Sequence, residues 1–325
     1  MSQIEARIHA LSIPTPFPVG PVNVYLLEGD PLTLVDTGPL TEEASSALAR
    51  GLDDLGYALA DIDQLVITHA HHDHFGLARQ VVERSGAIVL SLAENRERLE
   101  DFGDWWEHRM AALAELVVAQ GAPREALADI EIIRGFGRYA TAVPDVVPVE
   151  DNDDLRMGGT MWRAIHTPGH THGHLCLYQP AHQLLLSGDH LLEHITPNPV
   201  LETPRLGMTE RPRSLVDYRR SLRRIRELEV SKVLPGHGDP VDDHRPVVDA
   251  ILTHHEERGR QIQQLIRERD STAYELGLAL FGGNLPGVEL LLVMSEIIGH
   301  LDVLELEGKV RRLERDGRPV WTAIN

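Results

Sequence analysis

The chain has 325 residues, of which 42% are hydrophobic and 25% are charged, so it can form a large globular domain followed by a smaller one. Its formal net charge of −19 repels phosphate backbones, which argues against broad binding to nucleic acid or to an anionic membrane. A single Cys176 excludes an internal disulfide, no apolar run approaches the ~18 residues of a membrane span, and the N-terminus lacks a signal-peptide pattern, so we expect a cytoplasmic protein.

The first part of the chain alternates short apolar runs with amphipathic ones, which predicts a mixture of strands and helices. Thr41 is expected to be the N-cap of a helix that ends near Leu55, and a second helix is expected over residues 75–84. Strands are expected over residues 7–13, 22–28, 32–35, 64–68 and 87–90. The strand over 64–68 runs directly into His69, where a histidine cluster begins.

The sequence of residues from about 94 to 140 has a helical pattern, which predicts a helical insertion. Trp105 and Trp106 lie among its apolar positions, either as part of a lid over the site or as plain core. A helix is expected over 214–228. Further strands are expected over residues 160–166, 175–179, 183–187 and 232–234.

The pattern changes beyond residue 245, which predicts a catalytic domain over 1–245 and a smaller domain over 246–325. Helices are expected over residues 247–269, 272–280 and 287–304, and strands over 309–314 and 319–323. The last two strands flank Asp316-Gly317, a strong hairpin signal. Helices followed by a hairpin favour a winged-helix module.

Four imidazoles and one carboxylate fall within the six residues 69–74. Imidazole and carboxylate are the ligands that zinc and similar ions prefer. His69 and His71 are two positions apart, so extended backbone would point both the same way, and Asp73 and His74 follow as the chain turns into a helix. His72 points the other way in such a segment, and we expect it to be a core or hydrogen-bonding residue.

Three later motifs place a possible ligand where a strand ends. His170 closes Thr-Pro-Gly-His, Asp189 closes Ser-Gly-Asp, and His237 lies in Pro-Gly-His-Gly. Metal ligands and catalytic residues tend to collect in such loops.

The order HAHHDH at 69–74, then TPGH, SGD and PGHG, with Asp36-Thr37-Gly38 before them, resembles the metallo-β-lactamase fold superfamily over residues 6–245. The resemblance, which includes glyoxalase II-like metal motifs, implies an α/β fold in which an αββα sandwich holds two metal ions at one edge. It implies that Asp189 bridges the two ions. The other implied ligands are His69, His71 and His170 for the first ion and Asp73, His74 and His237 for the second.

Asp36 is expected to accept a hydrogen bond from a ligand imidazole, although an Asp-Thr-Gly turn alone would also explain it. We expect two divalent ions, zinc in the first place and iron or manganese as alternatives. Two such ions bridge a water and bring its pKa toward about 7, so a bridging hydroxide is the expected nucleophile. Asp73 and Asp189 are the expected catalytic carboxylates.

The tail resembles the winged-helix tail of one hydrolase branch of that superfamily, which includes a single-strand-specific endoribonuclease and acyl-thioester hydrolases. The first hypothesis is therefore hydrolysis of a small acyl thioester or ester. Cleavage of single-stranded RNA is the alternative enzyme function, and a metal-bound winged-helix regulator without catalysis is an alternative of another class.

The charge balance of the tail bears on these alternatives. From residue 245 on there are ten Lys and Arg against thirteen Asp and Glu, which is unfavourable for nucleic acid, although the hairpin itself is basic. The tail is instead expected to cover the site or to form a homodimer. Residues with weaker claims to a substrate contact are His172, His174, His190, His194, Arg138 and Tyr139.

Overall fold

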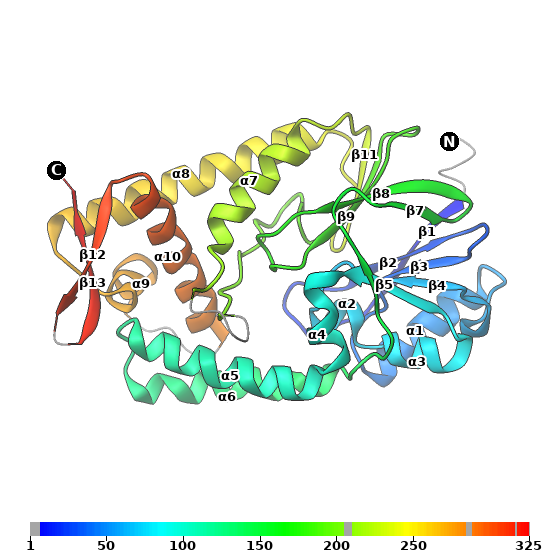
Figure 1. Ribbon diagram of the computed structural model, residues 1–325, viewed down its shortest axis with the longest axis horizontal. Helices are drawn as coiled ribbons and strands as arrows, with labels where there is room; N and C mark the ends of the chain where they lie inside the picture. The colour runs from blue at the N-terminus through cyan, green and yellow to red at the C-terminus, as the bar shows by residue number, and fades with distance from the viewer. Residues whose placement is uncertain (1–6, 205–209, 284–287, 316, 325) are drawn as a thin grey trace.

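The computed structural model describes residues 7–204, 210–283, 288–315 and 317–324. The molecule is elongated, with two β-sheets at one end and a group of long helices at the other (Figure 1). Among the described residues, no helix is both long enough and apolar enough to span a membrane.

The first sheet has the strand order β1-β2-β3-β4-β5-β6. Its first three strands are antiparallel neighbours, and β3 to β6 are parallel. The strands are β1 (Ile8–Ile13), β2 (Val22–Leu27), β3 (Thr33–Val35), β4 (Gln64–Val66), β5 (Ile88–Leu92) and β6 (Val147–Val149).

The second sheet has the order β11-β10-β9-β8-β7, and its one parallel pair, among the described residues, is β10 with β11. Its strands are β7 (Asp154–Met157), β8 (Thr160–His166), β9 (Leu175–Gln179), β10 (Leu184–Gly188) and β11 (Lys232–Pro235). A shared core of Val35, Val66, Trp162, Leu177 and Leu186 joins the facing sides of the two sheets.

Helices cover the outer faces of both sheets, so the αββα sandwich expected from the sequence is confirmed. On the first sheet lie α1 (Glu42–Asp53) and α3 (Ala78–Ser85), and on the second lie α7 (Ser214–Arg226) and the beginning of α8 (His244–Glu268). Burial of these apolar faces provides the main stabilisation of the sandwich.

The remaining helices form the other end of the molecule (Figure 1). Most of their buried apolar residues belong to the same cluster as the outer core of the first sheet, so the insertion and the tail pack together. The insertion contains α4 (Arg96–Glu100), α5 (Phe102–Ala119) and α6 (Leu127–Arg134). The tail continues from α8 with α9 (Ala273–Phe281), α10 (Val288–Leu306), β12 (Val310–Arg315) and β13 (Arg318–Ala323). Short 3-10 turns are η2 (Leu59–Asp61), η3 (Ala93–Asn95), η4 (Arg124–Ala126) and η5 (Gly135–Tyr139).

Some elements differ from the sequence prediction. The helix expected over 75–84 is two helices, because α2 (His72–Phe75) begins inside the histidine cluster and Gly76 separates it from α3. A Cβ on Gly76 would lie 2.4 Å from the Leu40 nitrogen and the Tyr139 oxygen, so this close approach requires glycine.

Two strands, β6 and β7, were not predicted. The first contains Pro148 and lies at the edge of its sheet, and the second reads Asp-Leu-Arg-Met, so neither shows a clear apolar alternation. The helix expected from 247 begins at His244 with Asp243 as its N-cap, because a proline is tolerated in the first turn. Of the expected hairpin turn, Asp316 lies outside the described residues.

Candidate metal centre

The ends of four strands bring the predicted ligands to one edge of the sandwich. Beyond β4 the chain forms no helical turn before α2, and the φ and ψ of His71, −92° and 147°, are extended. His69 and His71 therefore precede the helix, whereas Asp73 and His74 lie on it. The other ligands follow β8, β10 and β11.

The first group of possible ligands contains His69, His71, His170 and Asp189, whose ligand atoms all lie within 4.8 Å of one another. His71 Nδ1 is 3.0 Å from the Nε2 atoms of both His69 and His170. Asp189 Oδ2 lies 3.9 Å from His69 Nε2 and 3.6 Å from His170 Nε2. Three imidazoles and one carboxylate thus face a common point.

The second group contains Asp73, His74 and His237. His237 Nε2 is 3.4 Å from Asp73 Oδ2. Asp189 also faces this group, with Oδ1 3.4 Å from His74 Nε2 and Oδ2 3.7 Å from His237 Nε2. Asp189 therefore lies between the two groups, and all seven predicted ligands come together in space.

Three of the ligand imidazoles contact hydrogen-bond acceptors through Nδ1, the nitrogen that points away from the ligand groups. His74 Nδ1 lies 2.8 Å from Asp36 Oδ2, while the Asp36 carboxylate also accepts from the Thr68 amide at 2.8 Å and its hydroxyl at 2.7 Å. The Nδ1 atoms of His170 and His237 face the carbonyl oxygens of Asn198 at 3.0 Å and Pro21 at 2.8 Å. Such contacts turn Nε2 of each ring toward the two ligand groups, where it could bind a metal.

The residues at this site fit a pair of metal ions. Within the described chain, His74 Nε2, His237 Nε2 and Asp189 Oδ1 are buried and have no hydrogen-bond partner. Unsatisfied buried polar atoms are costly, and a metal ion would satisfy all three at once. Imidazole nitrogen with carboxylate oxygen is the donor set of zinc, iron and manganese sites.

The electrostatics also suit a cation. Burial raises the pKa of Asp189, but the His74 and His237 imidazoles outweigh burial and hold this pKa well below its usual range. For Asp73, burial is outweighed by the contact with His237, and the pKa falls to about 2. Burial lowers the pKa of His69 well below its usual value, which favours the neutral imidazole that binds metals.

Glycine lets the chain pass close to these ligands. A Cβ on Gly236 would lie 2.4 Å from Asp189 Oδ1 and 2.9 Å from His74 Cε1. Gly236, the first glycine of Pro-Gly-His-Gly, therefore leaves room for these two ligands where a larger residue would clash.

The weaker histidine candidates lie in different places. His174 accepts the Asp189 amide at 3.1 Å through Nε2, so it positions that ligand from behind. His190 is buried against the Tyr218 ring, and the His172 amide donates to Glu202 at 3.3 Å. The His194 side chain is 78% exposed and pairs with Glu193, so it does not join the ligands.

The Arg138 guanidinium donates a hydrogen bond to the Tyr139 phenol oxygen at 2.7 Å. Neither residue lines the apolar cavity beside His71. The sequence predicts His72 in an extended segment, but in the structure it is the first residue of α2. Its buried ring packs edge-on against Trp106 at 4.6 Å, and burial lowers its pKa to about 4.

A cavity of about 180 Å³ opens beside His71. The insertion supplies Trp105 and Trp106, and α10 supplies Leu291 and Leu292. Further apolar lining residues are Met110, Leu113, Ile133, Phe136, Val200 and Leu201. The helices thus form an apolar chamber that opens on the first ligand group.

Three charged residues in this cavity were missed by sequence reasoning, namely Arg98, Arg109 and Glu202. Arg109 is the one of them with a signal, because it lies on the apolar face of α5 between Trp106 and Leu113. Glu202 lies in the Pro-rich stretch, where no periodicity marks it.

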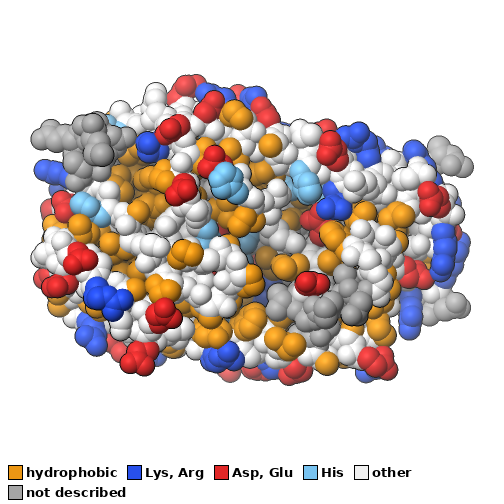
Figure 2. Space-filling model, turned by 180° about the vertical axis from the view of Figure 1, so that it is seen from behind, with side chains coloured by type: hydrophobic (Ala, Val, Ile, Leu, Met, Phe, Trp, Pro, Cys, Tyr) orange, Lys and Arg blue, Asp and Glu red, His pale blue; other side chains and the backbone are white. Residues whose placement is uncertain are grey.

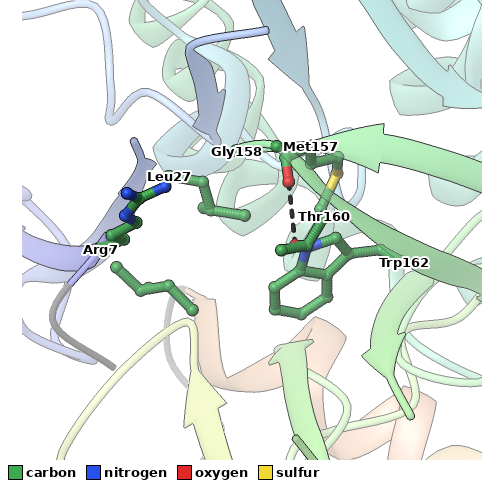
Figure 3. A pocket seen from close by; sticks show the side chains of 8 residues that line it. Arg7, Leu27, Met157, Gly158, Thr160 and Trp162 are labelled. Atoms are coloured by element: carbon green, nitrogen blue, oxygen red, sulfur yellow. Dashed lines mark hydrogen bonds between the residues drawn. The ribbon is translucent and has the colours of Figure 1, made fainter. Parts of the chain in front are cut away.

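A second cavity, of about 250 Å³, lies at the opposite edge of the sheets, where β2 ends and β7 turns into β8 (Figure 3). Leu27, Met157 and Trp162 line it, and the Thr160 hydroxyl donates to the Met157 carbonyl at 3.2 Å. None of the seven predicted ligands lines this cavity, so it is separate from the candidate metal centre.

Known proteins similar to this chain have the metallo-beta-lactamase fold or are named metallo-hydrolases. The family model described as "Metallo-beta-lactamase superfamily" matches residues 17–237. The probable metallo-hydrolase YqjP of Bacillus subtilis is 35% identical over 306 residues, which cover 93% of each chain.

The crystal structure of the metallo-beta-lactamase family protein TTHA1429 from Thermus thermophilus superposes with a TM-score of 0.82 at 29% identity, over 98% of this chain and 99% of that one. The atrochrysone carboxyl ACP thioesterase of Aspergillus fumigatus is 24% identical over 191 residues, which cover 54% of this chain and 42% of the thioesterase. The similarities to YqjP and to TTHA1429 cover 93% and 98% of this chain, so they extend over the helices and the tail as well as the sandwich.

Proposed function

The chain belongs to the metallo-beta-lactamase superfamily and is a metallo-hydrolase, and from this premise we propose that it hydrolyses small acyl thioesters or esters at a centre of two metal ions. The observation that carries the proposal is the small apolar cavity that opens beside His71. The proposed ligands are those expected from the sequence, with His69, His71 and His170 on one ion, Asp73, His74 and His237 on the other, and Asp189 between them.

Bound there, two ions, proposed to be zinc, would activate water and polarise the scissile carbonyl group. The chain's own residues then have defined tasks. Asp73 is ionised at neutral pH and can accept a hydrogen bond from the attacking water. Asp36 fixes the orientation of His74. In the reaction the water oxygen bonds to the acyl carbon, the carbon–sulfur or carbon–oxygen bond breaks, and an acid and a thiol or alcohol leave.

The thioester class has support from the cavity and from one relative. Apolar side chains of the insertion and of α10 surround the space beside His71, as an acyl chain would require. The Aspergillus relative is named a thioesterase, and its similarity covers 54% of this chain.

We propose that the tail from about residue 246 is a winged-helix domain whose role is to close this cavity. The order α8, α9, α10, β12 and β13 supports the assignment, and so does an isolated antiparallel bridge between Ser271 and Trp321 beside the two-stranded sheet. Residues Leu291, Leu292 and Ser295 of α10 line the cavity.

Cleavage of single-stranded RNA is the second candidate, and the observation in its favour is the hairpin, where Arg311, Arg312 and Arg318 are exposed. This hairpin lies at the end of the molecule away from the sheets (Figure 1). Basic side chains gather at that end in Figure 2, but elsewhere on that face they are mixed with acidic ones. The net charge of −19 also opposes a polyanion, so we favour the acyl substrate.

The experiment is metal analysis of protein purified without chelator, followed by turnover assays on an acyl-thioester panel and on a fluorescent single-stranded RNA. We expect about two metal ions per chain and thioester cleavage that a chelator abolishes. Cleavage of the RNA without cleavage of any thioester would replace the proposal by the second candidate, and stable protein without metal would overturn the metal centre.

A further inference from the structure

One wall of the cavity beside His71 carries a buried cluster of three charges. Arg98, Arg109 and Glu202 are 9%, 8% and 2% exposed. Arg98 forms a fork on Glu202, with its Nη1 and Nη2 atoms 3.0 and 2.9 Å from the two carboxylate oxygens. Arg109 donates through Nη1 to Glu202 at 2.8 Å and through Nη2 to the Leu201 carbonyl at 3.1 Å. The cluster therefore has a formal charge of +1.

The hydrogen bonds of this cluster leave donors in excess. A guanidinium has five N–H donors, and among the described residues the bonds of Arg98 and of Arg109 use two on each. The Glu202 carboxylate is already occupied by three guanidinium contacts and by the His172 amide at 3.3 Å. The remaining donors are therefore available to an acceptor from outside the cluster.

The surroundings supply little to neutralise the extra charge. The Trp105 ring lies under both guanidinium carbons, at 5.0 Å from that of Arg98 and 5.5 Å from that of Arg109. Among the described residues that line the cavity, Glu202 is the only acidic one, and most of the others are apolar. An uncompensated buried charge is costly, whereas a planar carboxylate would both neutralise it and match the guanidinium fork.

The size of the cavity limits what can bind there. Its volume of about 180 Å³ is smaller than the roughly 300–1,000 Å³ of sites that enclose a drug-sized ligand. The cavity can therefore hold one short arm of a substrate while the scissile bond remains at the metal ligands, of which His71 lines the same cavity.

We propose that this cavity binds the acyl arm of the substrate and that Arg98 and Arg109 bind a carboxylate at the distal end of that arm. This inference rests on the proposed function and narrows it to thioesters or esters of short dicarboxylic acids. Arg98 and Arg109 are then specificity-determining residues. The apolar walls contact the methylene groups between the two ends.

The test compares two thioesters of N-acetylcysteamine that differ in one terminal group, glutaryl with a carboxylate and valeryl with a methyl group. For the metal-loaded full chain we expect kcat/KM at least tenfold higher for glutaryl. Arg109→Gln leaves the Arg98–Glu202 pair neutral, so it should remove that preference and bring kcat/KM for the glutaryl thioester to within threefold of that for the valeryl thioester. Arg96→Gln is the matched control, because Arg96 pairs with Glu100 on the exposed side of α4 and should leave the preference intact.

A binding measurement separates this inference from the proposed function. Calorimetry on metal-free protein should show valerate binding at least tenfold more tightly than valeramide, and Arg109→Gln should abolish the difference. If the valerate preference is present but no thioester is cleaved, the cavity assignment holds and the proposed function fails. Equal binding of valerate and valeramide by the wild-type protein, or equal turnover of the two thioesters, overturns the inference even if the variant does not fold.

Discussion

The metal centre and the cavity beside it are built in opposite ways. The metal centre is made from short segments at strand ends and is rich in carboxylates and imidazoles. The cavity is made from helices that lie far apart in the sequence, and its charge excess is positive. Under the proposed function, one region of the molecule holds the groups for chemistry, while the other determines the shape and charge of the substrate that reaches them.

The two regions meet in the segment 198–202. The Asn198 carbonyl accepts from the ring of His170, and the Asn198 side chain donates to the Leu292 carbonyl on α10 at 3.0 Å. Glu202, at the other end of the segment, joins the arginine cluster. Substitutions on either side of this segment should therefore separate metal binding from substrate choice.

The largest effect is expected from Asp189→Asn, which removes the carboxylate between the two ligand groups. Turnover should fall by a factor on the order of 10³ or more. This exceeds the ~10–100-fold loss that follows when a residue hydrogen-bonded to a metal ligand is removed. The metal content should drop while the fold persists. Elemental analysis, circular dichroism and the thioester assay check this. His72→Ala should keep its metal, and full activity of Asp189→Asn with two ions bound would contradict the assignment.

The next largest effect is expected on the cavity side, where Glu202→Gln should lower the free energy of unfolding. The substitution leaves two buried guanidiniums without their carboxylate, and breaking a buried pair in this way costs about 3–5 kcal/mol. Urea unfolding should show the loss, whereas the metal content of the folded fraction should not change. A loss of metal equal to that of Asp189→Asn would mean that the two regions are not separable.

Asp36→Asn should have a smaller effect at the metal side. Asp36 has a positive φ of 61°, which asparagine tolerates, so the backbone should be unchanged. The substitution replaces the carboxylate that faces His74 Nδ1, and the expected result is a ~10–100-fold loss of metal affinity. A competition titration with a chelator measures the metal affinity. An unaltered affinity would show that Asp36 stabilises only the Asp-Thr-Gly turn.

The same contrast explains what could be predicted from sequence. The ligand positions were predictable because His69, His71, Asp73 and His74 lie within six residues, and because strand ends gather at one edge of a sheet. The division of the expected helix into α2 and α3 was not predicted, since it occurs at Gly76, whose close contacts are with Leu40 and Tyr139 at distant positions in the sequence. Such contacts leave no periodic mark in the sequence.

The cavity could not be predicted in the same way. Arg98 and Glu202 are 104 positions apart, and their pairing depends on how the insertion packs against the segment 198–202. The sequence predicted an apolar helical insertion with Trp105 and Trp106, but periodicity does not specify which helix faces it across the cavity. Leu291 and Leu292 of α10 do so in the structure.

The smallest predicted effect is a pH dependence that arises in the helical region, away from the metal centre. Burial lowers the pKa of His255 to about 3, and the nearby His300, His254 and Arg219 add to the shift, while the Tyr218 ring packs against it at 5.7 Å. Below the unfolded pKa of about 6.5 the unfolded chain binds a proton that folded His255 does not. The free energy of unfolding therefore falls by up to about 1.4 kcal/mol per pH unit as pH drops from 6.5 toward 3.

Urea unfolding at pH 7.5 and pH 5.5 measures this contribution. His255→Gln should unfold more easily at pH 7.5 but show a drop between the two pH values that is smaller by about 1 kcal/mol. His254→Gln, at the adjacent and more exposed position, should keep the wild-type drop. Because metal binding also depends on pH, the measurement should be repeated on metal-free protein. If the difference between His255→Gln and the wild type disappears without metal, the effect comes from the metal centre, and the helical region has no pH dependence of its own.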